Sequence, residues 1–227
     1  MTTPLRLVIF DVDGTLVDSQ GHIVASMTMA FQALGAKAPT REAILGIVGL
    51  SLTVGVPLLA PTLTGVQHSA LVQGYKDSYA HLRETHGAAE ASPLYPGARE
   101  TLQKLHQNDD ILLGVATGKS KRGLDALIEA HGLERMFVTR QCADFHPSKP
   151  HPSMVHTALA EAGVDAADAV MVGDTSFDMD MAHTAGVTGI GVTWGYHAPV
   201  ALTAATHIVQ DFDALHSTIN THWSLPV

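Results

Sequence analysis

The sequence has one cysteine, few basic residues and no apolar run long enough to cross a membrane. Because Cys142 is alone, no disulfide can form within the chain, and we expect a reducing compartment, the cytoplasm. Only 13 lysines and arginines face 22 aspartates and glutamates, which gives a net charge of −9. With so little positive charge we expect no nucleic-acid partner, and without a membrane-length run we expect no membrane partner.

The chain is long and apolar enough to build a sizeable core. It has 227 residues, of which 46% are hydrophobic and 15% charged. This composition is typical of folded globular proteins and excludes a disordered chain. The length fits one large domain, or a domain that carries an insertion.

The apolar run at residues 5–10 leads directly into Asp11-Val12-Asp13-Gly14-Thr15. A short run without alternation predicts a strand that is buried on both faces. Acids at the end of such a strand lie at the carboxyl edge, where open α/β sheets bind ligands. An isolated Asp13-Gly14 pair would favour a hairpin turn, but residues 15–19 do not resemble a matching return strand. The acids therefore indicate a site.

The rest of the chain divides into two parts with different predicted secondary structure. Helices without a convincing strand are expected between residues 16 and 90, at 22–34, 40–46, 50–59 and 67–86. After a Pro- and Gly-rich junction, expected helices (98–107, 122–131, 153–162 and 178–185) alternate with expected strands (111–116, 137–140, 169–172, 189–192 and 208–209). Such alternation predicts an α/β fold with a doubly wound parallel sheet. We therefore predict a discontinuous core of residues 1–16 and 92–227, and an inserted all-helical cap domain of residues 17–91.

Further polar clusters stand in or just after the expected links at the same edge. They contain Thr117, Lys149, Asp174 and Asp178. Carboxylates brought together there repel one another by roughly 4 kcal/mol at an effective dielectric constant near 20, so they need a cation. Hard oxygen ligands favour Mg²⁺. With Lys149, the Thr117 hydroxyl and backbone amides as donors for an anion, the clusters predict a phosphoryl-transfer site.

In order and spacing, these motifs resemble those of the haloacid dehalogenase superfamily, in its phosphoglycolate-phosphatase-like branch with a helical cap. The resemblance implies a Rossmann-like core and a Mg²⁺-dependent phosphatase that forms an aspartyl-phosphate. It makes Asp11 the nucleophile and Asp13 the general acid and base, whose backbone carbonyl also binds the metal. The implied metal ligands are Asp11, Asp13, Asp174 and Asp178, of which Asp178 contacts the metal either directly or through another ligand. The implied phosphate-binding residues are Thr117, Gly118 and Lys149, with Gly118 standing where relatives often have asparagine.

Several functions share these residues. A small phosphomonoester such as phosphoglycolate is the substrate we expect first, and a β-phosphoglucomutase-like phosphomutase or a pyrophosphatase is the alternative. Such mutases tend to carry a histidine at the position of Ile23, and here His22 is one place off. A non-catalytic phospholigand-binding protein would be expected to lack a nucleophile or a metal ligand, and none is missing. Dehalogenases lack the acid that matches Asp13, which excludes halide chemistry.

Substrate contacts are expected from both parts of the chain. Lys119 and Arg122 follow the expected phosphate loop, and Leu50 and Ser51 lie in a glycine-flanked cap loop that we expect to reach the substrate. Cap cations that could bind a substrate carboxylate are Arg41, Lys76 and Arg83. The expected partner is a small phosphorylated metabolite, and the superfamily resemblance implies a monomer or weak homodimer.

Two other motifs are weaker. Residues 114–120 resemble a phosphate-binding P-loop but are one residue short between the glycines, and the amide cradle depends on that length. His146, His151 and His156 recur every five residues, a spacing that does not share one helix face. We expect neither a nucleoside triphosphatase nor a histidine metal site.

Overall fold

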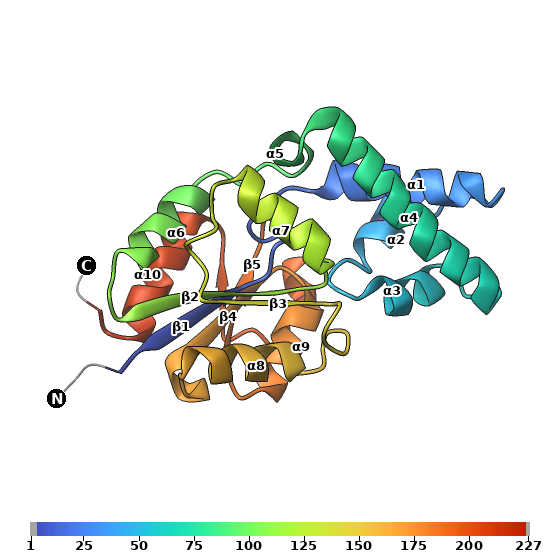
Figure 1. The fold of residues 1–227 in the computed structure, drawn as a ribbon. Helices are drawn as coiled ribbons and strands as arrows, with labels where there is room; N and C mark the ends of the chain where they lie inside the picture. Colours follow the sequence, from blue (N-terminus) through green and yellow to red (C-terminus); the bar gives the residue numbers. More distant parts are fainter. Residues whose placement is uncertain (1–3, 226–227) are drawn as a thin grey trace.

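The computed structural model describes residues 4–225 and places a parallel sheet at the centre of the larger part of the molecule (Figure 1). Its strands are β1 (Arg6–Phe10), β2 (Ile111–Thr117), β3 (Thr139–Cys142), β4 (Ala169–Gly173), β5 (Thr188–Val192) and β6 (His207–Val209). Their order across the sheet is β3-β2-β1-β4-β5-β6, with every neighbouring pair parallel. The connections therefore reverse direction between β1 and β4, which creates the crevice where doubly wound sheets bind ligands.

Helices cover both faces of the sheet, which explains why the first strand is apolar throughout. Leu7 and Ile9 pack into one apolar cluster with the helices below the sheet in Figure 1, while Val8 and Phe10 pack into a second cluster with the helices above it. The core helices and 3₁₀ turns are α6 (Ala98–His106), α7 (Lys121–Ala130), α8 (Ser153–Ala162), η1 (Ala166–Asp168), α9 (Ser176–Thr184), η2 (Pro199–Ala201) and α10 (Phe212–His222). Complete burial on both faces leaves only the strand ends for polar side chains.

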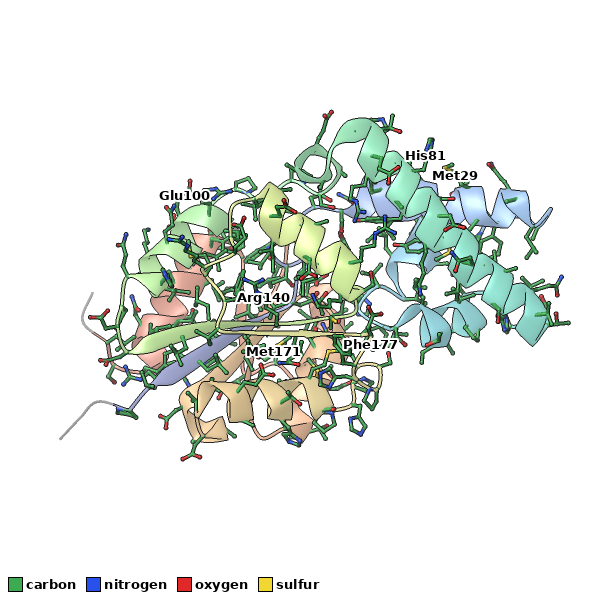
Figure 2. All side chains as sticks on the ribbon, viewed as in Figure 1. Met29, His81, Glu100, Arg140, Met171 and Phe177 are labelled. Carbon is green, nitrogen blue, oxygen red and sulfur yellow. The ribbon has the colours of Figure 1, made fainter. Side chains whose placement is uncertain are left out.

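The helical cap lies beyond the carboxyl edge of the sheet, at the right of Figure 1. It comprises α1 (Gln20–Ala33), α2 (Arg41–Leu45), α3 (Leu52–Leu59), α4 (Gly65–His86) and α5 (Ala88–Ala91). It has its own apolar cluster, in which Met27 and Ile44 are buried, whereas Met29 and His81 lie on its outer surface (Figure 2). In residues 4–225, no helix combines the length and the apolar character that a membrane crossing requires.

The two connectors of the cap run side by side. The Asp18 N–H donates to the Pro93 carbonyl at 2.9 Å, and the Tyr95 N–H donates to the Leu16 carbonyl at 3.0 Å. Between them Val17 and Leu94 form an isolated antiparallel bridge. The chain thus leaves the core and rejoins it at one joint, directly after the first pair of acids.

The predicted fold class, a doubly wound parallel sheet with an inserted helical cap, is confirmed. The domain boundaries 1–16, 17–91 and 92–227 stay our proposal. The third strand was placed wrongly by two residues, at 137–140 instead of Thr139–Cys142. Phe137 and Val138 supplied the apolar signal, yet Val138 is 55% exposed and only precedes the edge strand.

Candidate active site

The predicted motif residues converge at the carboxyl edge of the sheet. Asp11 follows β1, Thr117 ends β2, Asp174 follows β4 and Lys149 stands in the link after β3. The strands that carry Asp11 and Asp174 are the neighbours β1 and β4, at the reversal of strand order. The topology alone therefore brings together residues that are far apart in the sequence.

Lys149 is the cation at the centre of these acids. Its Nζ lies 2.7 Å from Asp11 Oδ1 and 2.6 Å from Asp178 Oδ1, and its side chain is completely buried. Although burial opposes the charge, the two carboxylates raise the pKa of Lys149 above its usual value. Burial raises the pKa of Asp11 to about 7, even though Lys149 lowers it. One ammonium thus offsets only part of the negative charge.

Backbone and hydroxyl donors hold the other two acids in place. Asp174 accepts from the Thr15 hydroxyl at 3.0 Å and from the Tyr196 N–H at 2.7 Å. Burial and the nearby Asp11 raise the pKa of Asp174 well above its usual value. Asp178 closes a capping box with Thr175 at the start of α9. Both acids are fully buried and oriented before any ligand arrives.

These acids fit a divalent cation. One oxygen from each of Asp11, Asp174 and Asp178 lies within 4.8 Å of the others, which is the one such group of possible ligands in residues 4–225. Asp11 Oδ2 is buried and has no hydrogen-bond partner in the structure. A buried carboxylate oxygen without a partner is costly, and a hard cation such as Mg²⁺ would satisfy it. His146 instead contacts the hydroxyl of Ser153 at 2.9 Å.

Two glycines let the backbone approach Asp174 closely. Gly14 has a φ of +88°, and a Cβ there would lie 2.3 Å from Asp174 Oδ2. A Cβ on Gly195 would lie 2.1 Å from the Asp174 Cβ. Any larger residue at either position would displace this carboxylate. Gly195 indicates tight packing in the sequence, and the structure places that packing against a site carboxylate.

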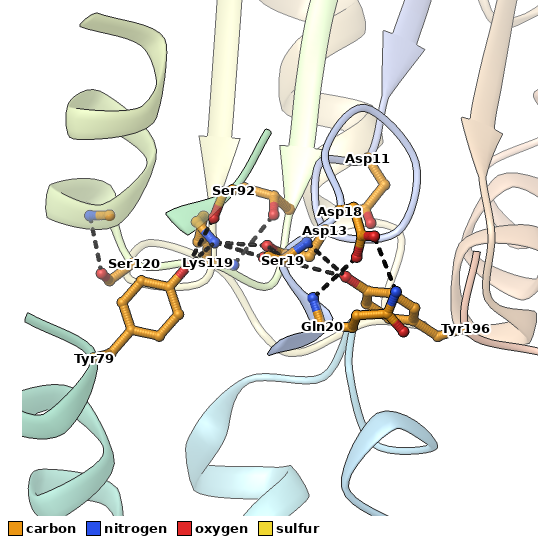
Figure 3. A network of polar contacts seen from close by, with 12 residues as sticks. Asp11, Asp13, Asp18, Ser19, Gln20, Tyr79, Ser92, Lys119, Ser120 and Tyr196 are labelled. Atoms are coloured by element: carbon orange, nitrogen blue, oxygen red, sulfur yellow. Dashed lines mark hydrogen bonds and ion pairs between the residues drawn. The ribbon is translucent and has the colours of Figure 1, made fainter. Parts of the chain in front are cut away.

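Asp13 belongs to a second polar network, drawn in Figure 3, which Tyr196 joins to the acid cluster. Lys119 Nζ lies 2.7 Å and 2.9 Å from its two oxygens, and the Ser19 hydroxyl donates to Oδ1. The Tyr196 hydroxyl lies 3.0 Å from Ser19 Oγ, and Lys119 Nζ donates to Tyr79 Oη of the cap at 3.3 Å. The sequence predicted Lys119 as a substrate contact, whereas here it pairs with Asp13 and with the cap.

A cavity of about 380 Å³ lies between the core edge and the cap. Its core side includes Asp11, Asp13, Thr117, Gly118 and Lys119. The predicted substrate residues Arg122 and Leu50 also line it, whereas Ser51 does not. The Ser51 N–H instead donates to Ser148 Oγ at 2.9 Å and ties the cap loop to the core. Buried Lys149, Asp174 and Asp178 lie outside the lining.

The cap loop rests against the predicted phosphate loop at Gly118. A Cβ on Gly118 would lie 2.5 Å from the Gly49 carbonyl oxygen, and a Cβ on Gly49 would lie 3.2 Å from Thr175 Oγ1. The absence of side chains at both positions therefore permits the cap to close on two core loops. This contact gives a reason for glycine at the position where relatives often carry asparagine.

Gly118→Ala is expected to push the cap loop off the core. Because the clash is with backbone, we expect kcat/KM for p-nitrophenyl phosphate to fall about tenfold, or roughly 1.4 kcal/mol, with little change in thermal stability. Gly65→Ala is the matched control, since a Cβ there meets nothing within 4 Å. Wild-type kcat/KM in Gly118→Ala would show that closure at this loop is not needed.

Comparison with known proteins agrees with this geometry. A family model described as haloacid dehalogenase-like hydrolase matches residues 8–192. The chain belongs to this family. Among solved structures, a haloacid dehalogenase-like hydrolase from Streptococcus pneumoniae superposes with a TM-score of 0.81 at 26% identity, covering 94% of this chain and 98% of that one.

Curated relatives of this haloacid dehalogenase-like hydrolase are named as phosphatases. One from Dickeya dadantii, named "Probable phosphatase IndB", is 40% identical over 202 residues, or 88% of this chain and 86% of that protein. A phosphoglycolate phosphatase from Vibrio parahaemolyticus is 30% identical over 209 residues, or 88% of this chain and 89% of that protein. The chain is thus an enzyme of the phosphatase type.

Several residues that contact the site aspartates lie outside the predicted motifs, and the sequence did not predict their role. Ser19 and Tyr196 are 177 positions apart, so no local spacing could pair them. Tyr79 lies within a long polar cap helix that gave no sign of reaching Lys119. Gly195, in the link after β5, is the residue outside the motifs whose small size could have indicated a close contact with Asp174.

Proposed function

We infer that the protein is a Mg²⁺-dependent phosphatase that hydrolyses a small phosphomonoester through an aspartyl-phosphate on Asp11. One observation carries this proposal: within residues 4–225, Asp11 is the one acid of the cluster with a buried oxygen that has no hydrogen-bond partner, and it lines the cavity under the cap. Lys149 and two further carboxylates surround it. The phosphoglycolate phosphatases among the relatives make phosphoglycolate the first natural compound to assay.

In the first step a carboxylate oxygen of Asp11 attacks phosphorus, and the bond from phosphorus to the leaving oxygen breaks. Asp13, beside Asp11 in the same cavity, donates its proton to that oxygen as the alcohol departs. Thr117, the Gly118 backbone amide and Lys149 hold the other phosphoryl oxygens. Ser19 and Lys119 keep the carboxyl group of Asp13 aimed at the cavity.

In the second step water attacks phosphorus of the aspartyl-phosphate and gives up a proton to Asp13. The bond between phosphorus and Asp11 breaks, inorganic phosphate leaves, and both aspartates return to their starting states. Mg²⁺ would be held by Asp11, Asp174, the Asp13 carbonyl and, directly or through water, Asp178, and when bound it would supply positive charge against the phosphoryl oxygens. Cap closure excludes bulk water while the phosphoenzyme forms.

The phosphomutase alternative finds no support in the cap. At the position where such mutases tend to carry a histidine, Ile23 is buried in the apolar cluster of the cap and lines the cavity. His22 packs its ring against Tyr79 and His86, at 5.7 Å between centroids in each case. No imidazole of these two positions is therefore offered to Asp13.

Metal removal tests the proposal directly. We expect p-nitrophenyl phosphate to be hydrolysed in the presence of Mg²⁺, and the rate to fall at least about 100-fold after treatment with EDTA and return when Mg²⁺ is restored. Mg²⁺ should also raise the melting temperature, since it binds the folded state and relieves the acid cluster. Full activity in the metal-free enzyme would show that the acids do not act as ligands of a required metal ion.

A further inference from the structure

The cap side of the active-site cavity is largely apolar, with Gln73, Lys76, Asp77 and Arg83 on α4 as its polar and charged residues. Asp11 and Asp13 form its base, whereas side chains from α1, α2, α3, α4 and the loop after α2 form its roof. The apolar and aromatic roof residues are Ile23, Met27, Ile44, Ile47, Val48, Leu50, Leu52, Tyr75, Tyr79 and Ala80. The volume of about 380 Å³ is in the range of pockets that enclose drug-sized ligands. A short leaving group would leave much of it unfilled.

The apolar residues of this roof suit an uncharged group and penalise a charged one. Ile23, Met27 and Ile44 are 5% or less exposed and offer no donor to a carboxylate. A carboxylate pressed against them would lose its water without compensation. An apolar ring in the same place would gain roughly 25 cal/mol for each Å² of apolar surface that it buries.

Two tyrosines on α4 add an aromatic wall. The rings of Tyr75 and Tyr79 are 5.8 Å apart between centroids, and both line the cavity. Burial, Tyr79 and Asp13 raise the pKa of Tyr75 well above its usual value. Tyr75 thus keeps its hydroxyl proton and adds a hydrogen-bond donor to an aromatic residue of the cavity wall.

Two of the cations that line the cavity lie near carboxylates of the protein, and the other two are on helix α4 of the cap. Lys119 is paired with Asp13, and Arg122 lies 4.0 Å from Glu84 with a largely exposed side chain. Lys76 and Arg83 line the cavity from α4 without an ion pair in the described part of the chain. They are the groups that a substrate carboxylate would have to use.

We propose that this site prefers phosphomonoesters whose leaving alcohol carries an uncharged, ring-sized apolar group over the compact, charged phosphoglycolate. The proposal rests on the phosphatase function above and names its substrate class. The reaction is the same hydrolysis, in which the ring-bearing alcohol takes the proton of Asp13 and inorganic phosphate is the second product. The apolar roof residues and the tyrosine pair would contact the leaving group.

The test compares leaving groups of similar acidity. We expect kcat/KM for 2-phenylethyl phosphate to exceed that for ethyl phosphate and for phosphoglycolate by at least about tenfold, a difference of roughly 1.4 kcal/mol. Ethyl phosphate isolates the ring, because it differs from 2-phenylethyl phosphate only in lacking it. A tenfold preference for phosphoglycolate, or equal values for the phenylethyl and ethyl esters, would overturn the proposal.

Cap variants separate the roof from general damage. Leu52→Ser should lower kcat/KM for 2-phenylethyl phosphate about fivefold, with a smaller effect on ethyl phosphate, because the lost contacts are those of the ring. Leu58→Ser is the matched control, since Leu58 is on the same helix, 64% exposed and outside the cavity lining. Equal losses on both esters in Leu52→Ser would contradict the proposed ring contact.

The outcomes keep the two proposals apart. If Arg83→Gln lowers phosphoglycolate hydrolysis tenfold in an enzyme that prefers phosphoglycolate, the substrate carboxylate lies at Arg83 and only the leaving-group inference fails. If neither p-nitrophenyl phosphate nor any of these esters is hydrolysed in the presence of Mg²⁺, both the phosphatase proposal and the leaving-group inference fail.

Discussion

Asp11→Asn is expected to abolish phosphatase turnover, by at least about 10⁴-fold in kcat, while the protein stays folded. An amide has nearly the shape of the carboxylate but cannot attack phosphorus, and it cannot bind a cation with the same charge. In the metal-free protein the change also removes a negative charge from beside Asp174 and Asp178. The melting temperature without metal should therefore be unchanged or higher, not lower.

Rapidly quenched enzyme provides the decisive measurement. Its intact mass should gain a phosphoryl group during turnover in the wild-type protein, and not in Asp11→Asn. Asp180→Asn is the matched control, because Asp180 is exposed on α9 and outside the acid cluster. Appreciable turnover by Asp11→Asn, or a phosphoryl adduct in it, would remove Asp11 as the nucleophile.

Lys149→Met is expected to damage both stability and activity. It leaves Asp11 and Asp178 buried without their shared ammonium, and breaking such a buried pair typically costs about 3–5 kcal/mol of unfolding free energy. Activity should fall at least about 100-fold, since the phosphoryl oxygens lose a fixed positive charge. Added Mg²⁺ should recover part of the stability, because it replaces charge among the same carboxylates.

Urea unfolding in EDTA, repeated in Mg²⁺, measures this effect. Lys121→Met is the control, because Lys121 pairs with Asp125 at the surface, where such pairs contribute about 0–1 kcal/mol. Equal unfolding midpoints for Lys149→Met and Lys121→Met in EDTA would mean that the buried ammonium does not stabilise the acid cluster.

The sequence predicted the parts of the site that a strand end carries. Asp11, Thr117 and Asp174 each follow or end an apolar run, so the parallel topology was enough to bring them together. The third strand was harder to place, because Thr139, Arg140 and Gln141 are polar. The burial of Thr139 and Gln141 is offset by partners that no strand pattern encodes, such as Glu161, which accepts from the Thr139 hydroxyl at 2.6 Å.

The residues that orient the Asp13 side chain could not be predicted from strand ends and motif spacing. Lys119 was singled out because it follows the phosphate loop, but its pairing with Asp13 depends on how far β2 extends past β1 at the sheet edge. The contact from Tyr79 depends on the angle at which the cap docks, which is a property of packing between helices. Motif spacing carries no information on either quantity.

The paired connectors at Val17 and Leu94 have a consequence for how such enzymes diversify. Because the inserted segment begins and ends at one point, its length hardly affects the core: each doubling of a flexible loop costs only about 0.6 kcal/mol in closure entropy. A different module grafted between these two positions would meet the same aspartates. A change of residues 20–91 as a block can thus alter which substrates are recognised, while the aspartates of the core stay the same.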